Sequence, residues 1–291
     1  KSLPDARSWR PNILVLSGAP TQRFYLIQLA DAITHGKSLL TVASIISNKE
    51  ITNERIENMK KSMREYLTKR NIPSLIEVTT ADTMLQGVQS LAKTYGLGLL
   101  YPNTYLFGET EETEKFNEFA EVINTLYQLK RNIIIVREGE TAKKEHNKYK
   151  RIYVWWRGKE NNASLMLTLA YMLQTSPEWK GASLILKTIV KSEEGRRAII
   201  ENVNKFLSES RLRAQSEILV ENHDRESVAR LIRNFSKDGD LVFLGMKPPG
   251  QEESAEEYAE YYKNLLNQTR QFPPLCLVLA GEEQKFSEVF Q

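Results

Sequence analysis

The segment Ile152-Tyr-Val-Trp-Trp156 decides the fold, because it holds two adjacent tryptophans within a run of apolar residues. Successive side chains of a β-strand point to opposite faces, so Trp155 and Trp156 would place one indole on each face. Each indole buries a large area, and its N–H group needs a hydrogen-bond partner. The segment therefore predicts a strand at the centre of a sheet, heavily packed on both faces.

Nine further short apolar runs have the length and composition of strands, and most are continuously apolar rather than alternating. Continuous apolar runs are typical of parallel strands that are covered on both faces. The ten predicted strands are 13–16, 39–46, 75–78, a run within 97–107, 133–136, 152–156, 184–190, 218–220, 241–244 and 275–279.

Amphipathic helical patterns lie between these runs. Apolar residues recur at helical spacing in four stretches, 56–67, 84–95, 116–127 and 255–266. Strands that alternate with helices form parallel sheets joined by right-handed crossovers. The predicted fold class is therefore α/β.

The two halves of the chain look duplicated. Gly18 and Gly158 follow the first strands of the two halves and are 140 residues apart; Ile133 and Leu275 open the last strands and are 142 apart. A near-constant offset indicates two related subdomains. We predict a first subdomain at 1–138, a polar connector at 139–150 and a second subdomain at 151–291. Each would be a mostly parallel five-stranded sheet flanked by helices, an arrangement similar to two universal-stress-protein-like units.

Composition bounds the class of protein. Hydrophobic residues make up 41% of the 291 residues, enough for sizeable cores. Net charge is only +3, which disfavours a nucleic-acid surface with its concentrated basic face. The single Cys276 excludes an internal disulfide and fits a reducing compartment. There is no signal peptide and no apolar run of the roughly 20 residues that cross a bilayer, and the chain begins at Lys1, so we expect a soluble fragment of a longer protein.

Segments along nearly the whole chain resemble, in order, the cytosolic C-terminal domain of cation–chloride cotransporters. The strand 152–156 is followed by a very apolar helix, 164–174, and then by Trp179-Lys180. The matching segments elsewhere are Ser8-Trp-Arg-Pro-Asn12 leading to Gly18, then Tyr95-Gly-Leu-Gly98 with Pro102-Asn-Thr104, and finally Asp240-Leu-Val-Phe-Leu-Gly245 with Pro248-Pro249, Tyr258, Pro273-Pro274 and Ala280-Gly281.

The resemblance implies a regulatory and dimerising domain, on the cytoplasmic side of the cell membrane, without chemistry of its own. Its partners would be a second copy and the transmembrane transport domain of the same polypeptide. Animal members of the family often have a much longer connector that carries regulatory sites. The short connector here indicates a prokaryotic type and argues against control by phosphorylation.

The residues that could carry catalysis are few and scattered. His35 falls where a helix ends, and His146 falls in the connector. His223 lies beside Asp224 in a polar loop, where Asp224 would cap a helix, and the pair lacks the clustered ligands that a metal needs. Cys276, between two leucines of a strand, is typical of inert core packing. We predict no catalytic, cofactor-binding or metal site.

The architecture resembles nucleotide-binding folds, in which glycine-rich loops bind phosphate. No P-loop is present, and Gly96-Leu-Gly98 lacks a third glycine, since Tyr101 stands in its place. We place the loops that would bind phosphate, after the fourth strands, at Tyr101-Pro-Asn-Thr104 and Gly245-Met-Lys-Pro-Pro-Gly250, where prolines remove N–H donors. The best remaining ligand candidate is the turn Ser17-Gly-Ala-Pro-Thr21, but the preferred interpretation is a plain tight turn with Thr21 as helix cap.

The helix 164–174 has almost no polar side. A helix that is apolar all round is buried on every side or lies against another protein. One hypothesis is that it forms the interface of a homodimer; the other is that it lies between the two subdomains. The leading function is thus a non-enzymatic regulatory domain of a cotransporter, and the alternative is a nucleotide- or small-ligand-sensing module. A stand-alone α/β hydrolase or transferase ranks last.

Overall fold

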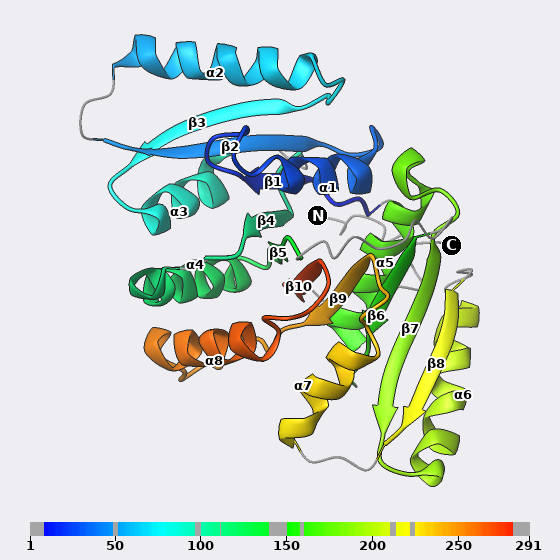
Figure 1. Cartoon of the computed structure of the whole chain (residues 1–291). Helices are drawn as coiled ribbons and strands as arrows, with labels where there is room; N and C mark the ends of the chain where they lie inside the picture. The colour runs from blue at the N-terminus through cyan, green and yellow to red at the C-terminus, as the bar shows by residue number, and fades with distance from the viewer. Residues whose placement is uncertain are drawn as a thin grey trace, which may run out of the picture. The chain divides into compact units, whose positions relative to one another are not determined.

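The computed structural model describes residues 9–48, 52–96, 100–110, 112–139, 150–157, 160–209, 214–221 and 225–281. Strands and helices alternate along them (Figure 1). The chain divides into two compact units, each described by itself. The first unit comprises Arg10–Val136 with Pro248–Lys263, and the second comprises Arg137–Lys247 with Asn264–Gln291 and Lys1–Trp9. Most of the predicted connector, 140–149, lies outside the described residues, so the predicted domain boundaries stay a prediction.

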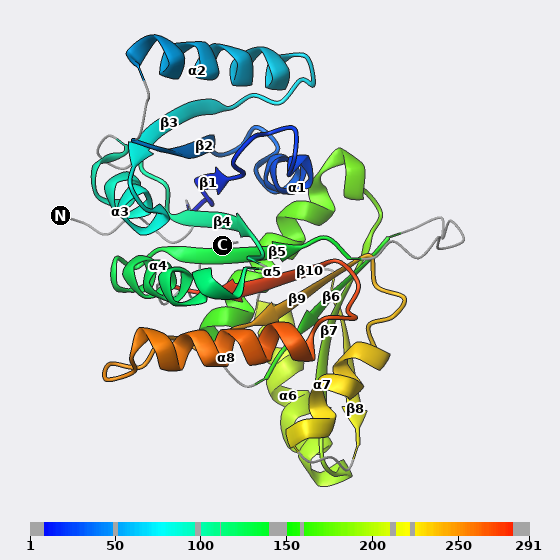
Figure 2. The same ribbon diagram turned by 60° about the vertical axis from the view of Figure 1, so that its left-hand side comes forward.

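The first unit is built on a parallel sheet of five strands in the order β3-β2-β1-β4-β5. Its elements are β1 (Ile13–Leu16), α1 (Phe24–Thr34), β2 (Leu40–Ser47), α2 (Asn53–Thr68), β3 (Leu75–Ala81), α3 (Met84–Thr94), β4 (Thr104–Gly108), the 3-10 turn η2 (Thr113–Lys115), α4 (Phe116–Gln128) and β5 (Asn132–Arg137). Helix α1 packs on β1, β2 and β4, whereas α3 and α4 pack against each other (Figure 2). Right-handed crossovers place α1 and α2 on one face of the sheet and α3 and α4 on the other.

The second unit repeats this plan, with strands in the order β8-β7-β6-β9-β10. Its elements are β6 (Arg151–Trp155), α5 (Glu160–Thr175), the 3-10 turn η3 (Pro177–Trp179), β7 (Ser183–Val190), α6 (Glu193–Glu209), β8 (Ala214–Val220), α7 (Arg225–Asn234), β9 (Leu241–Gly245) and β10 (Leu275–Leu279). The helix α8 (Ala255–Gln268), between β9 and β10 in the chain, is divided: its residues up to Lys263 belong to the first unit and the rest to the second. Because the first strand is central in both units and the order matches strand for strand, the predicted fold class of two duplicated five-stranded α/β sheets is confirmed.

Strand β6 lies at the centre of its sheet, between β7 and β9. Trp155 is 1% exposed, and its indole N–H donates to the Ser236 hydroxyl at 2.8 Å. The expectation of a heavily packed central strand is thus correct. The strand ends one residue earlier than predicted, at Trp155, and Trp156 follows it in a half-buried position, so the expectation of one indole on each face stays a prediction.

Helix α5 is buried almost all round by the chain itself. Leu165, Leu167, Leu169 and Leu173 have no exposed surface, and only Tyr171 within 165–173 is half-buried. The helix packs on β6, β7, β9 and β10 of its own unit. The hypothesis that this apolar helix offers its surface to a second copy is therefore wrong.

Within the described ranges, none of the helices is both long enough and apolar enough to span a bilayer.

Candidate functional site

The candidate site lies at the carboxyl edge of the first sheet, beside the turn that follows β1. The strand order reverses at β1, since β2 lies on one side of it and β4 on the other. Ligands of open α/β sheets bind at the carboxyl ends of the strands, near such a reversal. The structure thus places Ser17-Gly-Ala-Pro-Thr21, the best ligand candidate in the sequence, where this architecture binds ligands.

A glycine and a neighbouring serine hold this turn open. Gly18 has φ +64°, a left-handed conformation that favours glycine, and no atom lies within 4 Å of where its Cβ would be. The Ser44 hydroxyl donates to the Gly18 carbonyl at 2.7 Å and so ties the turn to β2. The expectation that Thr21 caps α1 is wrong: the helix begins at Phe24, and Arg23 stands at its N-cap without a side-chain hydrogen bond.

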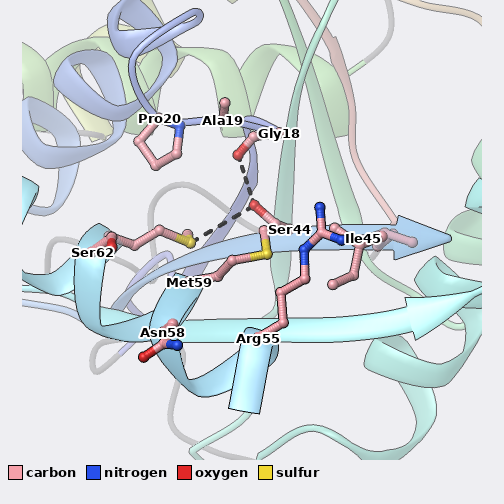
Figure 3. Close-up of a pocket in the computed structure, with 11 residues that line it drawn as sticks. Gly18, Ala19, Pro20, Ser44, Ile45, Arg55, Asn58, Met59 and Ser62 are labelled. Carbon is pink, nitrogen blue, oxygen red and sulfur yellow. Dashed lines mark hydrogen bonds between the residues drawn. The ribbon is translucent and has the colours of Figure 1, made fainter. Parts of the chain in front are cut away.

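A hollow of about 550 Å³ opens between this turn, β2 and α2. Its volume is within the usual range for small-molecule sites. Figure 3 shows Arg55 and Met59 extending from α2 toward Ser44 and Ile45 of β2. The walls are mostly apolar, formed by Ala19, Pro20, Ile45, Ile46, Met59 and Met63. The polar lining residues are Gly18, Ser44, Arg55, Asn58 and Ser62.

The position of Arg55 is set by the start of α2. The Thr52 hydroxyl accepts a hydrogen bond from the Arg55 backbone N–H at 3.3 Å, as an N-cap residue does. The first turn of α2, where the helix dipole is positive, therefore lies at the rim of the hollow.

A second hollow, of about 300 Å³, adjoins the first and shares Gly18, Ile45 and Ile46 with it. It continues toward the ends of β1 and β3, where Arg23 and Asp82 line it. The Arg23 guanidinium lies over Gly108, the last residue of β4, and a Cβ at Gly108 would come within 3.1 Å of it. Both hollows belong to the first unit.

The predicted phosphate loop of the first unit is misplaced. Tyr101-Pro-Asn-Thr104 comes before β4, not after it, and the N–H groups of Asn103 and Thr104 bond to the Asn12 carbonyl. The sequence placed a strand within 97–107 without fixing its first residue. In the structure the strand begins only at Thr104, after Pro102. The segment that does follow β4 is the acidic stretch 109–114, which would repel phosphate.

The corresponding turn of the second unit, Gly245-Met-Lys-Pro-Pro-Gly250, is closed by neighbouring groups. Asn162, in the first turn of α5, donates from its side-chain amide to the Met246 carbonyl at 2.7 Å. Its amide oxygen accepts from the Ala280 N–H at 2.8 Å. The N–H group of Gly250 donates to the Glu253 carboxylate at 2.9 Å. This turn therefore offers little to a phosphate.

The other sequence candidates do not come together. His35 directly follows α1, whereas His146 and His223 lie outside the described residues. Cys276 is fully buried in β10, and this burial raises the pKa of its thiol far above the usual range, so it stays protonated. Among the described residues, no three His, Cys, Asp or Glu side chains are placed to hold a metal ion.

One charged side chain that the sequence analysis did not identify is buried. Neighbouring groups neutralise its charge and accept its hydrogen bond. Lys187, in the middle of β7, is 4% exposed. Its ammonium pairs with Glu217 at 3.0 Å, donates to the Phe235 carbonyl at 2.7 Å and lies 3.9 Å from the centre of the Tyr153 ring. These contacts give Lys187 a structural role between β7 and the end of α7.

We predict that ATP binds weakly or not at all. The acidic stretch after β4 repels a polyphosphate. In the turn 245–250, the Met246 carbonyl is already bonded to Asn162 and the Gly250 N–H to Glu253. Isothermal titration calorimetry of the chain with ATP and Mg²⁺ should show no saturable heat at micromolar concentrations. A micromolar dissociation constant would contradict this prediction.

Comparison with known structures defines the class of fold. The chain resembles a universal stress protein from Archaeoglobus fulgidus DSM 4304, with 13% identity and a TM-score of 0.54 over 94% of this chain and 98% of that one. It also resembles the cytoplasmic domain of a prokaryotic cation chloride cotransporter, with 16% identity and a TM-score of 0.66 over 96% of this chain and 99% of that one.

Sequence comparison points to one family. Residues 23–145 match the model of solute carrier family 12. Solute carrier family 12 member 2 of Danio rerio is 24% identical over 140 residues, which are 46% of this chain and 12% of that protein. Cation-chloride cotransporter 1 of Arabidopsis thaliana is 24% identical over 169 residues, 56% of this chain and 17% of that protein. The chain thus matches less than a fifth of the length of these relatives, and the predicted resemblance to the cation–chloride cotransporters of solute carrier family 12 is confirmed.

Proposed function

We propose that this chain is a cytosolic regulatory and dimerisation domain of a cation-coupled chloride cotransporter, with no catalytic activity of its own. The observation that carries the proposal is the structural match over nearly the whole of both chains to the cytoplasmic domain of a prokaryotic cotransporter. The family match of residues 23–145, most of which belong to the first unit, supports it independently. Solute carriers are transporters, and the ion path would lie in a membrane domain of the same polypeptide.

Two potentially reactive side chains illustrate why we propose no catalysis. The Cys276 thiol is buried and stays protonated, and the Lys187 ammonium is engaged in structural contacts. A domain of this kind acts through binding. The proposed subdomain boundaries remain 1–138 and 151–291, joined by 139–150, on the cytoplasmic side of the cell membrane.

We expect the chain to form a two-fold homodimer. Because α5 is buried within the chain, the contact must use other surfaces. A stable dimer should bury at least about 1,000 Å² in total. Sedimentation equilibrium over a dilution series should give twice the 33.5 kDa chain mass at tens of micromolar. A single monomeric species at those concentrations would rule out dimerisation by this part of the protein.

The second candidate function is the sensing of a small ligand. The hollow beside residues 17–21 favours it, because the turn, β2 and α2 leave an open space of ligand size at the expected edge of the sheet. The two functions are compatible, since a regulatory domain can take its signal from a bound ligand.

A further inference from the structure

We propose that the two adjoining hollows of the first unit bind a small molecule with a flat apolar body and one compact anionic group. This inference names the ligand class for the second candidate function and rests on it. It does not depend on dimerisation, because both hollows are lined by residues of one unit.

The apolar body is indicated by the walls of the larger hollow. Ser44 and Ile46 lie on the face of β2 toward Met59 and Met63 of α2, and Pro20 lines one end. The Ile45 side chain points to the other face, against Gly87 of α3. Methionine side chains are flexible and polarisable, so they adapt to the faces of aromatic and aliphatic ligands. The Ser44 hydroxyl is already directed to the Gly18 carbonyl, which leaves few polar groups for the body of a ligand.

The anionic group is indicated by Arg55. It is the single charged residue among those lining the larger hollow. Within the described part of the chain, its guanidinium makes no ion pair or hydrogen bond, and it extends toward β2 (Figure 3). A planar guanidinium matches a carboxylate, sulfonate or phosphate oxygen pair. The helix dipole at the start of α2 adds to the attraction, and the Glu54 carboxylate in the same turn opposes it.

The charge balance of the smaller hollow limits the ligand to one anionic group. There Arg23 is accompanied by Asp82, so no net positive charge awaits a second anion. Arg23 also lies over Gly108, which Glu109, the first residue of the acidic stretch after β4, directly follows. A polyphosphate chain would meet these carboxylates, whereas a single anionic group would stay with Arg55.

In the second unit, Asn162 stands where Arg23 stands in the first. Gly245 ends β9 as Gly108 ends β4, and a Cβ at Gly245 would lie 2.9 Å from the Asn162 amide nitrogen. The same side chain bonds to Met246 and Ala280, the residues that directly follow β9 and β10. The inference assigns one ligand to each chain, in the first unit.

Paired fluorescent probes test the inference. The probe 8-anilinonaphthalene-1-sulfonate has a flat apolar body and one sulfonate, and N-phenyl-1-naphthylamine has the same body without the charge. In titrations of the chain, the sulfonate should bind with a one-to-one stoichiometry and about 10-fold more tightly than the neutral probe, as one charge-assisted contact implies. ATP should not displace it.

Variants of exposed residues on α2 separate this site from other surfaces. Arg55→Gln should remove the preference for the sulfonate and leave the neutral probe unaffected. Ser62→Phe should weaken both probes about 10-fold by filling the hollow, whereas Arg64→Gln, on the same helix but outside the lining, should change neither. Equal affinity for the two probes, a preference that survives Arg55→Gln, or more than one site per chain would overturn the inference. A monomeric chain with intact probe binding would refute the dimer alone.

Discussion

Replacing Trp155 with alanine is expected to lower the free energy of unfolding by about 3–5 kcal/mol, the range for a large aromatic removed from a core. The side chain is 1% exposed in the central strand of its sheet. The substitution leaves a cavity, and it also removes the partner of the fully buried Ser236 hydroxyl. Urea unfolding followed by far-ultraviolet circular dichroism measures the loss without relying on tryptophan fluorescence.

The matched control is the adjacent tryptophan. Trp156 lies beyond the end of β6 and is half-buried, so Trp156→Ala should cost about 1 kcal/mol, the size usual for partly exposed sites. Trp155→Phe should fall between the two, because it keeps most of the ring and loses the N–H donor. Equal losses for the two alanine variants would show that Trp155 does not anchor the core as the structure indicates.

The strands were predictable because most of them are covered on both faces and therefore continuously apolar. Strands 13–16 and 275–279 were predicted to the residue, as β1 and β10. Strand β8 was found only in part: its first residues, Ala214–Glu217, include exposed Gln215 and Ser216 and become a strand by pairing with β7. Local pattern cannot report a strand whose formation depends on its neighbour.

The turn of the candidate site was also predictable, since a glycine after an apolar strand marks a tight turn at the sheet edge. The opposite wall of the hollow, which α2 forms, was not predictable. Arg55 and Met59 lie about forty residues along the chain, and the apolar spacing of α2 showed Met59 only as part of a core-facing stripe. Only the packing of α2 beside β2 brings them opposite Gly18. In the same way, the burial of α5 follows from its surroundings, and its sequence left two explanations open.

Asn162 shows how the second unit departs from the first at the same place in the fold. It is 7% exposed, and one side-chain amide satisfies the Met246 carbonyl and the Ala280 N–H. The amide thereby holds α5 to the ends of β9 and β10. A search for catalytic residue types overlooks such a residue, because asparagine in the first turn of a helix usually indicates no more than a favourable helix start.

Asn162→Ala is expected to lower the free energy of unfolding by about 2–5 kcal/mol, since two hydrogen bonds are lost and the buried Ala280 N–H is left without its acceptor. Thr168→Val is the control on the same helix: that hydroxyl is equally buried but bonds only to the Ser164 carbonyl, so its loss should cost about 1 kcal/mol. Urea unfolding of both variants measures the difference, and similar losses would contradict the bridging role.

Asn162→Asp tests the same role by pH. Burial favours the neutral acid and raises the pKa of the carboxyl in the folded chain above its unfolded value. The neutral acid can still donate to the Met246 carbonyl and accept from the Ala280 N–H, whereas the carboxylate can only accept. The stability of Asn162→Asp relative to the parent chain should therefore be greatest below the unfolded pKa, near pH 4, and should fall as the pH rises through the folded pKa. A relative stability that is flat between pH 4 and pH 8 would mean that water reaches this position and that the second unit retains an open site as the first does.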